Sequence, residues 1–508
     1  MKMNTIFLPC RAARRAGSLL GVGLACLAAL AGNAKEAPKL SVSDREVDRS
    51  ARGVSYANVI KRVTPSVVTI EASRTVQVRP FRHPFMDDPA FRRFFGPDDS
   101  SGNGARKMRQ ESLGSGIIVT EDGYLLTNNH VIDGADEDGV KIVMPDGKTR
   151  YAAKVVGRDP RTDVAVLKIE ATKKLPALTL ADSDKLEVGD VVLAVGNPFG
   201  VGQSVSSGII SALGRDSGIL GRQGYEDFIQ TDASINQGNS GGALVDAEGR
   251  LIGINQSIAS PSGANAGVGF AIPINLARSV MERLVVDGKI TRGYLGVNLQ
   301  TITPELAEAF NLTETSGALV GGVQPGTPAA KAGIQEGDVI VAFNGKNVND
   351  SAHLRLMVAQ TPPKTAASFK VLRNGQPKNF NVTLAELPEN LTANRSDDGS
   401  DRPAETGSSA LTGVETTDLD RETRQQFDVP TRMRGVVVTK VEEESAAAEA
   451  GLRPGDVILE VNRQPVRSAQ ELDELLADTA GKRVLLRVYN SAGGQGGTRY
   501  LSVDLGKK

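Results

Sequence analysis

The stretch FIQTDASINQGNSGGALVDAEGRLIGIN, residues 228–255, contains the features that decide the fold of this part of the chain. Short Val/Ile-rich runs alternate with turn residues, and Asp246-Ala247-Glu248-Gly249 separates two of these runs like a hairpin turn. The glycines around Ser240 permit a tight backbone with N–H groups turned toward one point. The segment therefore predicts antiparallel strands with a loop that can present a nucleophilic hydroxyl beside an oxyanion hole.

The same pattern extends in both directions, from Val59 to about Ile258. Turn signals such as Glu121-Asp122-Gly123 and Pro145-Asp146-Gly147 separate further short apolar runs, which favours an all-β barrel or sandwich. Apolar residues at helical spacing then predict a closing helix over Asn275–Asp287.

One insert, residues 74–111, interrupts the strand pattern and is too long for an ordinary strand connection. It is rich in Phe, Pro and Arg and ends in a Gly/Ser/Asp stretch. Both a regulatory loop and a disordered insert fit this composition.

Length and internal similarity indicate three domains. The chain has 508 residues, and domains average about 150 residues. Residues 316–348 align without gaps on residues 434–466, so two copies of one module follow the β-rich domain. The polar segment 388–410 between them is typical of a flexible linker.

Composition and charge exclude several classes of protein. With 40% hydrophobic residues and 23% charged residues, the chain is neither collagen-like nor wholly disordered. Lys and Arg number 59 against 60 Asp and Glu, so there is no positive excess to attract phosphate backbones. We expect no nucleic-acid partner.

The N-terminus has the pattern of a secretory signal peptide over residues 1–34. A basic start precedes the apolar run 17–31, which is shorter than the roughly 20 residues of a membrane-spanning helix. Both cysteines, Cys10 and Cys26, lie in this segment. The mature chain would begin with a flexible lead, residues 35–55, and would have no disulfide, thiol nucleophile or Cys-based zinc site.

An imidazole general base has few candidates, because the chain has only three histidines. His130 ends the apolar run YLLTNNH, and Asp163 opens the run DVAVLKIE. Alone, each of these residues is equally compatible with a structural role, and the glycine-rich loop at Ser240 with an ordinary tight turn. Together they occur in the order His, Asp, Ser on one multi-stranded domain, which is the order of the chymotrypsin triad.

Several motifs closely resemble the HtrA family of serine endopeptidases, and the resemblance runs from about residue 56 to the C-terminus. These motifs are TNNHVI, DPRTDVAVLKI, VGNPFG, SSGIISALGR, the stretch 228–255 and GVGFAIP. The resemblance implies a mainly β protein: a chymotrypsin-like double β-barrel protease domain over 56–290, followed by PDZ domains over 291–387 and 411–508.

The resemblance also implies roles for individual residues. His130 would be the general base, Asp163 its orienting carboxylate and Ser240 the nucleophile, without metal or cofactor. The oxyanion hole would be formed at Gly238, Asn239 and Ser240. The specificity wall would run from about Ile254 to Ala266 and would begin with Asn255, Gln256 and Ser257 after Ile254. The family favours small or medium aliphatic side chains before the cleaved bond, and no acidic residue lies near Ile254 to hold a basic one, so we expect cleavage after Val, Ala, Ile or Leu.

Regulation is implied as well. The insert 74–111 would be the lid loop, although it lacks the cysteine pair of some relatives, and a loop starting at Arg215 (215–227) would sense PDZ occupancy. The first carboxylate loop would consist of Tyr294, Leu295, Gly296 and Val297, with residues 411–414 as a looser second candidate. His353 would start the helix beside the first groove, or be a plain surface residue. Alternatively, the second repeat mediates assembly and does not bind substrate.

Two functions remain open at this point. In the first, the chain is an ATP-independent periplasmic endopeptidase that degrades unfolded or misfolded envelope proteins, with PDZ domains that bind peptide C-termini. In the second, it is a holdase chaperone or scaffold with little proteolysis. The family implies a homotrimer or a higher homo-oligomer, with contacts near Tyr56.

Overall fold

A computed structural model of the chain describes residues 38–41, 43, 55–78, 106–197, 202–221, 223–236, 238–258, 267–388, 411–431, 433–477, 479, 483–490 and 496–506. The predicted signal peptide, most of the lead and of the insert 74–111, and nearly all of the linker 388–410 lie outside these residues.

Six antiparallel strands close the first barrel, in the order β1-β2-β3-β6-β5-β4. They are β1 (Val67–Val78), β2 (Arg106–Ile118), β3 (Tyr124–Asn128), β4 (Val140–Val143), β5 (Arg150–Asp159) and β6 (Val164–Ile169). The predicted turns at 121–123 and 145–147 join β2 to β3 and β4 to β5 as neighbouring antiparallel strands. Turn residues in the sequence thus locate these two hairpins.

The second barrel repeats this design, in the order β10-β11-β12-β9-β8-β7. Its strands are β7 (Val191–Gly196), β8 (Ser204–Arg215), β9 (Phe228–Thr231), β10 (Ala243–Asp246), β11 (Leu251–Ile258) and β12 (Gly269–Pro273). The expected closing helix is α4 (Ile274–Asp287). The prediction of a double β-barrel is confirmed.

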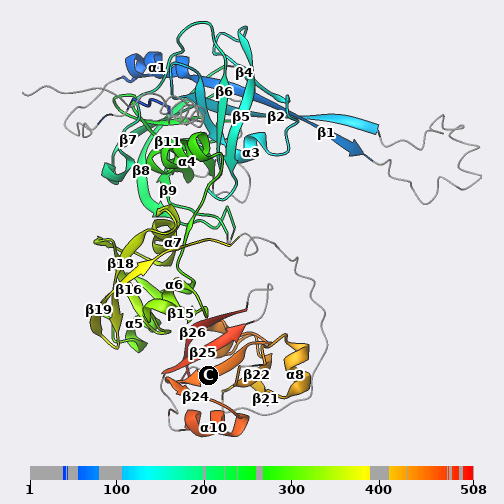
Figure 1. Cartoon of the computed structure of the whole chain (residues 1–508), viewed down its shortest axis with the longest axis vertical. Coiled ribbons are helices and arrows are strands. Elements are labelled where there is room, and N and C mark those ends of the chain that lie inside the picture. Colours follow the sequence, from blue (N-terminus) through cyan, green and yellow to red (C-terminus); the bar gives the residue numbers. More distant parts are fainter. Residues whose placement is uncertain are drawn as a thin grey trace, which may run out of the picture.

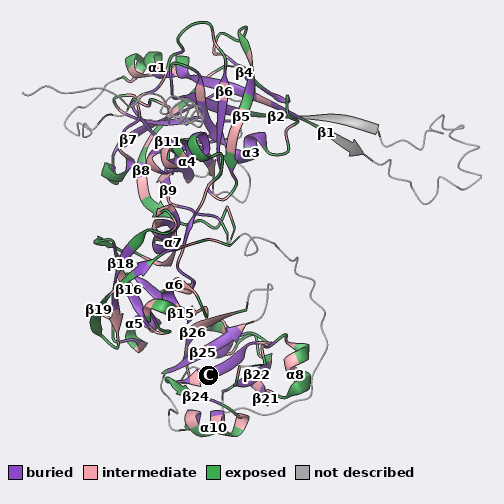
Figure 2. Cartoon of the chain, in the orientation of Figure 1, coloured by how far each residue is buried: buried purple, intermediate pink, exposed green. Residues whose placement is uncertain are grey.

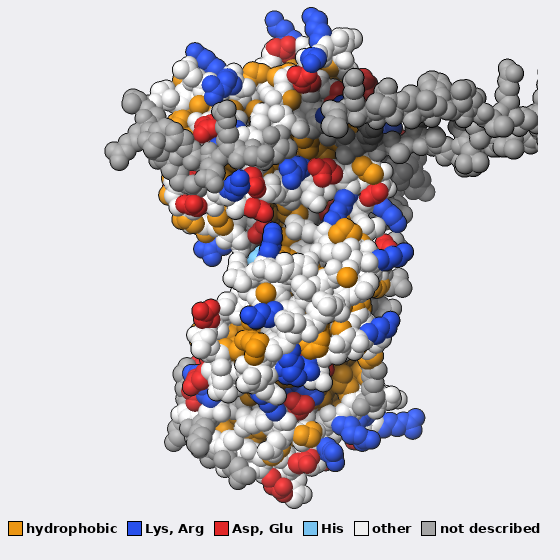
Figure 3. All heavy atoms as spheres, turned by 60° about the vertical axis from the view of Figure 1, so that its left-hand side comes forward, with side chains coloured by type: hydrophobic (Ala, Val, Ile, Leu, Met, Phe, Trp, Pro, Cys, Tyr) orange, Lys and Arg blue, Asp and Glu red, His pale blue; other side chains and the backbone are white. Residues whose placement is uncertain are grey.

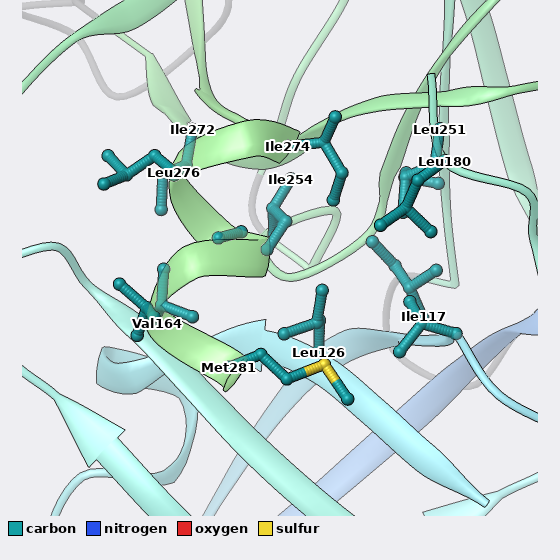
Figure 4. Close-up of a cluster of buried hydrophobic side chains, with 14 of the residues drawn as sticks. Ile117, Leu126, Val164, Leu180, Leu251, Ile254, Ile272, Ile274, Leu276 and Met281 are labelled. Carbon is teal, nitrogen blue, oxygen red and sulfur yellow. The ribbon is translucent and has the colours of Figure 1, made fainter. Parts of the chain in front are cut away.

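One continuous apolar core fills the space between the two barrels (Figure 4). Ile117, Leu126 and Val164 of the first barrel face Leu251 and Ile254 of the second, and Met281 of α4 closes the cluster. All six side chains are buried. Each buried aliphatic side chain contributes about 1.5–3 kcal/mol, so this junction fixes how the two barrels sit against each other.

The N-terminal part packs on the barrels through short elements. These are α1 (Ala57–Val63) and the 3-10 turn η1 (Thr64–Ser66); a second 3-10 turn, η2 (Ser183–Lys185), lies in the connection between the two barrels. Part of the predicted flexible lead is in contact with the domain, because Ser43 N–H donates to the Leu180 carbonyl and Leu180 N–H to the Ser41 carbonyl, both at 2.9 Å. Tyr56 precedes α1 and packs, partly buried, against the core.

The first repeat forms a sheet in the order β14-β15-β16-β18-β19, with β17 on β16 and a separate β13-β20 pair. Its elements are β13 (Gly293–Tyr294), β14 (Val297–Thr301), α5 (Pro304–Ala309), β15 (Ala318–Val323), α6 (Pro328–Ala332), β16 (Val339–Phe343), β17 (Lys346–Asn347), α7 (Ser351–Gln360), β18 (Ala366–Arg373), β19 (Gln376–Thr383) and β20 (Ala385–Glu386).

The second repeat has the same topology, in the order β21-β22-β23-β25-β26 with β24 on β23. Its elements are β21 (Val414–Asp418), α8 (Arg421–Gln426), β22 (Val436–Val441), α9 (Ala446–Glu449), β23 (Val457–Val461), β24 (Gln464–Pro465), α10 (Ala469–Ala477), β25 (Arg483–Asn490) and β26 (Gly497–Asp504). The internal repeat of the sequence is therefore a repeat of the structure.

The three bodies are stacked along the long axis of the molecule, with the barrels at one end and the second repeat at the other (Figure 1). Buried residues follow the strands within each body, while turns and short helices are exposed (Figure 2). Acidic and basic side chains are intermixed over the face in Figure 3, in agreement with the balanced composition. None of the helices in the described ranges has the length and apolar character of a membrane-spanning segment.

Candidate active site

His130 and Asp163 lie together at one end of the first barrel, because β3 and β6 pair with Asn128 opposite Val164. His130 follows β3 in a short helix, α3 (Asn129–Ile132), and Asp163 directly precedes β6. The distance from His130 Nδ1 to Asp163 Oδ2 is 2.7 Å, and the His130 backbone N–H donates to Asp163 Oδ1 at 2.9 Å. The sequence predicts His130 at a strand end, whereas the strand stops two residues earlier and the chain turns into α3.

The backbone of Asp163 is in the left-handed region, at φ 55°. This conformation is uncommon for a residue other than glycine and is typical of functional sites. Its carbonyl accepts hydrogen bonds from the Asn129 N–H at 3.0 Å and from Asn128 Nδ2 at 3.2 Å. These contacts hold the carboxylate, which is only 4% exposed, against a His130 side chain that is 48% exposed.

Ser240 lies in the loop between β9 and β10, where this loop meets the first barrel. Ser115 of β2 fixes the loop at Gly238 and at Ser240 itself. Its hydroxyl donates to the Gly238 carbonyl at 2.7 Å and its N–H to the Ser240 carbonyl at 2.8 Å. Sequence reasoning missed Ser115, since a serine within an apolar strand gives no signal of the loop that it will contact.

The glycine after Ser240 is required by space as well as by conformation. Gly241 has φ 82°, and a Cβ there would lie 2.1 Å from the Ser115 carbonyl oxygen. An L residue with a side chain would be strained at this φ, and its Cβ would clash with the Ser115 carbonyl oxygen. Within the described residues, the backbone N–H groups of Gly238 and Ser240 have no acceptor, while the Asn239 N–H donates to the Asn236 carbonyl at 3.0 Å.

The Ser240 hydroxyl points toward β11. Its Oγ donates to the Gln256 carbonyl at 2.9 Å, and no hydrogen bond in the described part of the chain joins it to His130. The structure thus brings His130 and Asp163 into direct contact, while Ser240, in the β9–β10 loop, has its hydroxyl bound to the Gln256 carbonyl.

The first two residues of the predicted specificity wall are core residues. Ile254 and Asn255 are fully buried: Ile254 packs in the core, and Asn255 Nδ2 donates to the carbonyls of Val195 at 3.3 Å and Ala243 at 3.2 Å. These two side chains therefore support the barrel. Residues 259–266, the rest of the predicted wall, lie outside the described residues.

Gln256 occupies a register shift in the β11–β12 pairing, between Asn255 and Ser257. Bulges of this kind redirect side chains and are frequent next to active sites. Here the Gln256 amide donates to Asp163 Oδ2 at 3.3 Å, while the Ser257 hydroxyl donates to Gln256 Oε1. Gln256 therefore contacts both Asp163 and Ser240, a link that sequence reasoning did not predict.

The loop 215–227 is folded around a buried carboxylate. Glu226 accepts hydrogen bonds from Ser217, Gly218 and Leu220. Arg215, at the end of β8, donates from Nε to Gln230 Oε1 at 2.9 Å within the same barrel. The first repeat also contacts this loop, but through loop residues other than Arg215.

That contact is made by Arg355 of α7. Its guanidinium donates to the Gly224 carbonyl at 2.7 Å and lies 5.4 Å from the Tyr225 ring centre, and Arg292 stacks on the same ring at 4.8 Å. Tyr225 N–H in turn donates to the Arg161 carbonyl at 2.7 Å, two residues before Asp163. A chain of direct contacts thus leads from α7 to the backbone beside Asp163.

The predicted carboxylate loop, Tyr294 to Val297, lies directly before and at the start of the edge strand β14. The Gly296 carbonyl accepts the Gln324 N–H at 2.9 Å, and Leu295 is buried in the core of the repeat. His353 is in the first turn of α7, where burial lowers its pKa and Nδ1 accepts the Asn349 N–H at 3.2 Å. In the second repeat Leu411, in the looser candidate loop, is buried in the core of that domain.

Among the described residues, no group of three or more His, Cys, Asp or Glu side chains is arranged to hold a metal ion.

Comparison with known proteins agrees with this architecture. A trypsin-like peptidase domain matches residues 114–254, and PDZ domains match residues 293–384 and 437–490. A probable DegP-like periplasmic serine endoprotease of Chlamydia muridarum is 41% identical over 470 residues, which is 88% of this chain and 90% of that protein. The chain belongs to the HtrA family of serine endoproteases.

Other HtrA proteins extend the comparison. The periplasmic serine endoprotease DegP of Salmonella typhimurium is 40% identical over 473 residues, covering 90% of this chain and 93% of that one. The solved structure of the HtrA-type protease AlgW with a decapeptide matches with TM-score 0.51 and 49% identity, covering 66% of this chain and 99% of that one. As an HtrA protein the chain is a serine endopeptidase with PDZ domains.

Proposed function

We propose that this protein cleaves unfolded or misfolded polypeptides in the periplasm, without ATP, through Ser240, His130 and Asp163. The contact between His130 and Asp163, placed beside Ser240 at the junction of two barrels, is the observation that carries the proposal. Asp163 fixes the ring with Nδ1 toward the carboxylate, which leaves Nε2 free to take a proton.

The cycle begins when the Ser240 side chain turns from the Gln256 carbonyl toward His130. Ser240 Oγ then attacks the substrate carbonyl carbon while His130 Nε2 takes the hydroxyl proton. The carbonyl π electrons move to oxygen, and this oxyanion accepts hydrogen bonds from the N–H groups of Gly238 and Ser240. Support for this role comes from the lack of any other acceptor for the two groups among the described residues.

Collapse of the tetrahedral intermediate breaks the C–N bond, and His130 returns its proton to the leaving amine. Water then attacks the ester in the same way, with His130 as base, and releases the carboxylic acid and free Ser240. Each proton taken by His130 is returned within its half of the cycle, so no cofactor is required.

We infer cleavage after small aliphatic side chains from the resemblance to the HtrA family, and the neutral character of β11 agrees with this inference. Its residues near the nucleophile, Gln256 and Ser257, are uncharged and would not bind a basic side chain. Since Ile254 and Asn255 face the core, we infer that the first part of the wall contacts substrate through its backbone. We propose that the PDZ domains bind peptide C-termini and that loop 215–227 transmits occupancy.

The periplasmic location rests on the relatives' names and on the signal-peptide pattern of residues 1–34. N-terminal sequencing of the protein from a periplasmic extract should begin near Lys35. We also propose a homotrimer or a higher oligomer with contacts near Tyr56. Sedimentation velocity should show at least three copies, and a monomer would contradict this.

The central experiment compares the full chain with Ser240→Ala on unfolded casein, with cleavage sites mapped by mass spectrometry. Cleavage should follow Val, Ala, Ile or Leu, and the variant should lose at least about a thousandfold in rate. Ser234→Ala, an exposed serine of the same loop, is the matched control and should retain activity.

Cleavage that survives in Ser240→Ala would exclude Ser240 as the nucleophile. If neither protein cuts and both suppress aggregation of the unfolded substrate, the holdase function replaces the protease.

A further inference from the structure

The second PDZ domain covers the outer face of the first PDZ sheet. One buried apolar cluster combines Phe310, Leu319 and Val339 of the first domain with Leu485 and Tyr500 of the second. The rings of Phe310 and Tyr500 meet edge to face at 5.2 Å, and burial raises the pKa of Tyr500 to about 12. A tyrosine at this depth between two domains indicates a specific interface.

The approach of the two domains depends on two adjacent glycines in β15. A Cβ at Gly322 would lie 2.2 Å from Thr498 Oγ1, and a Cβ at Gly321 would lie 2.7 Å from the Thr498 carbonyl oxygen. Both distances are shorter than any tolerated contact. At the aligned positions the second repeat carries Thr439 and Lys440, so a PDZ strand of this chain accepts side chains there. The glycines of the first repeat therefore serve the contact with β26.

Hydrogen bonds connect β26 directly to β14. The Gln300 side chain donates from Nε2 to the Tyr500 carbonyl at 2.7 Å and accepts the Tyr500 N–H at 2.9 Å. Thr498 Oγ1 donates to the Gly321 carbonyl at 2.6 Å. The Gln300 amide thus takes the place of a neighbouring strand and satisfies the exposed backbone of the edge strand β26.

Charges complement each other at the margin of the interface. Arg483 and Arg487 of the second domain pair with Glu308, at 2.8 Å, and Glu336 of the first. In both pairs the positive partner belongs to the second domain. The Arg483–Glu308 pair is exposed and adds little affinity, whereas Arg487 is only 16% exposed; both pairs favour one orientation of the two domains.

The covered strand is the one that would receive a peptide. β14 is an edge strand of its sheet, and Leu299 packs toward the domain core while Asn298 and Gln300 face the second domain. A bound C-terminus would extend the sheet at the free edge of β14. The geometry and mobility of this strand therefore depend on what covers its outer face.

We propose that the second PDZ domain is a docked support for the first, and that its β26 contact holds β14 in the geometry that binds a peptide C-terminus. This inference rests on the proposed peptide-binding function of the first PDZ domain. It assigns to the second repeat an intramolecular role, since its docking surface lies on the same chain.

The test uses Gly321→Thr/Gly322→Lys, which introduces the residues that the second repeat carries and should leave the strand folded. The matched control is Asn379→Lys, an added lysine on β19 of the same sheet. All variants are made in the full chain with Ser240→Ala, so that bound peptide is not cut.

Docking is measured apart from peptide binding. In a chain with Cys10→Ser and Cys26→Ser, the pair Asn298→Cys and Gly497→Cys should form a disulfide under mild oxidation, because a Cβ at Gly497 lies 3.5 Å from Asn298 Cγ. The glycine substitutions should reduce the crosslinking rate several-fold, and Asn379→Lys should leave it unchanged. Absence of crosslinking in the parent would overturn the docking.

Binding is measured with a photo-crosslinking peptide that has a free C-terminal valine, and adducts are mapped to 293–360 or 411–477. Affinity at the first domain should fall at least about fivefold in the glycine variant, the low end of typical coupling. Unchanged affinity despite lost docking would overturn the supporting role. If the parent forms no adduct at 293–360 while the cysteine pair still crosslinks, the proposed peptide-binding function fails, and this inference fails with it.

Discussion

At the scale of single residues, Gln256 connects the parts of the active site. Its backbone carbonyl holds the Ser240 hydroxyl and its amide donates to Asp163, and both contacts arise from one bulge in β11. The amide is the only side-chain donor to the Asp163 carboxylate besides His130 within the described residues. Gln256 is therefore a positioning residue for the His130–Asp163 pair.

Replacing Gln256 by Ala should lower kcat/KM about tenfold and leave KM nearly unchanged. Hydrogen bonds to charged groups contribute about 1.5–3 kcal/mol, and the 3.3 Å distance places this one at the weak end. With one donor fewer, the Asp163 carboxylate stabilises the imidazolium form of His130 more strongly. The acidic limb of the kcat/KM profile should therefore move to higher pH, as measured with a chromogenic peptide.

A suitable control is Ser234→Ala, at an exposed serine of the β9–β10 loop that is not a hydrogen-bond partner of Gln256 or Asp163 among the described residues. It should change neither the pH profile nor kcat by more than about twofold, since surface changes have small effects. An unshifted acidic limb in Gln256→Ala would mean that the residue acts on stability alone.

At the scale of elements, most of the fold follows from local sequence. The hairpin turns, the helix α4 and the repeated module were predictable because turn residues and apolar periodicity act locally. The inward direction of Ile254 and Asn255 was not predictable, because the bulge that sets it depends on pairing with β12. Ser115 was missed for a similar reason, since its contacts with Gly238 and Ser240 join strands that are distant in sequence.

The carboxyl group of Asp227, directly before β9, makes the stability of the protein sensitive to pH. Burial, with smaller contributions from Asp184 and Asp350, raises the pKa of Asp227 to about 7 from its ordinary value of 3.8. The folded state therefore keeps this proton up to about pH 7, while the unfolded chain releases it near pH 4. Stability should fall as pH rises between these values, by at most roughly 1.4 kcal/mol per pH unit, and level off above pH 7.

Asp227→Asn should remove this contribution, because the amide remains neutral at every pH. Thermal unfolding measured between pH 4 and pH 8 should show the variant and the parent nearly equal at the acidic end and the variant more stable at the alkaline end. Asp122→Asn, at a side chain that is 65% exposed, is the control and should follow the parent. Parallel curves for Asp227→Asn and parent would contradict a protonated Asp227 in the folded state.

At the scale of the whole molecule, each PDZ domain is fixed to its neighbour by a different kind of contact. The second domain packs an apolar face of its own strands against the first domain. The first joins the protease domain through α7, whose Leu356 and Ala359 lie near Leu276 and Val280 of α4 and extend the apolar cluster of the barrels. Arg355 lies beside them on the loop 215–227. A displacement of α7 would therefore be transmitted to the protease domain through direct side-chain contacts.

Arg355 is the residue through which this coupling can be tested. Its guanidinium both donates to Gly224 and stacks on Tyr225, and Tyr225 holds the backbone two residues before Asp163. Arg355→Ala should leave cleavage of a short chromogenic peptide within about twofold of the parent, because the residue touches no reacting atom. Stimulation of that cleavage by a peptide with an apolar C-terminus should fall at least about fivefold.

Two further variants test the role of the Arg355 guanidinium. Arg355→Lys should restore little of the stimulation, since an ammonium group cannot donate and stack in the same geometry. Lys364→Ala, on the exposed turn after α7, should keep full stimulation. Undiminished stimulation in Arg355→Ala would place the route between the first PDZ domain and the active site elsewhere than the loop 215–227.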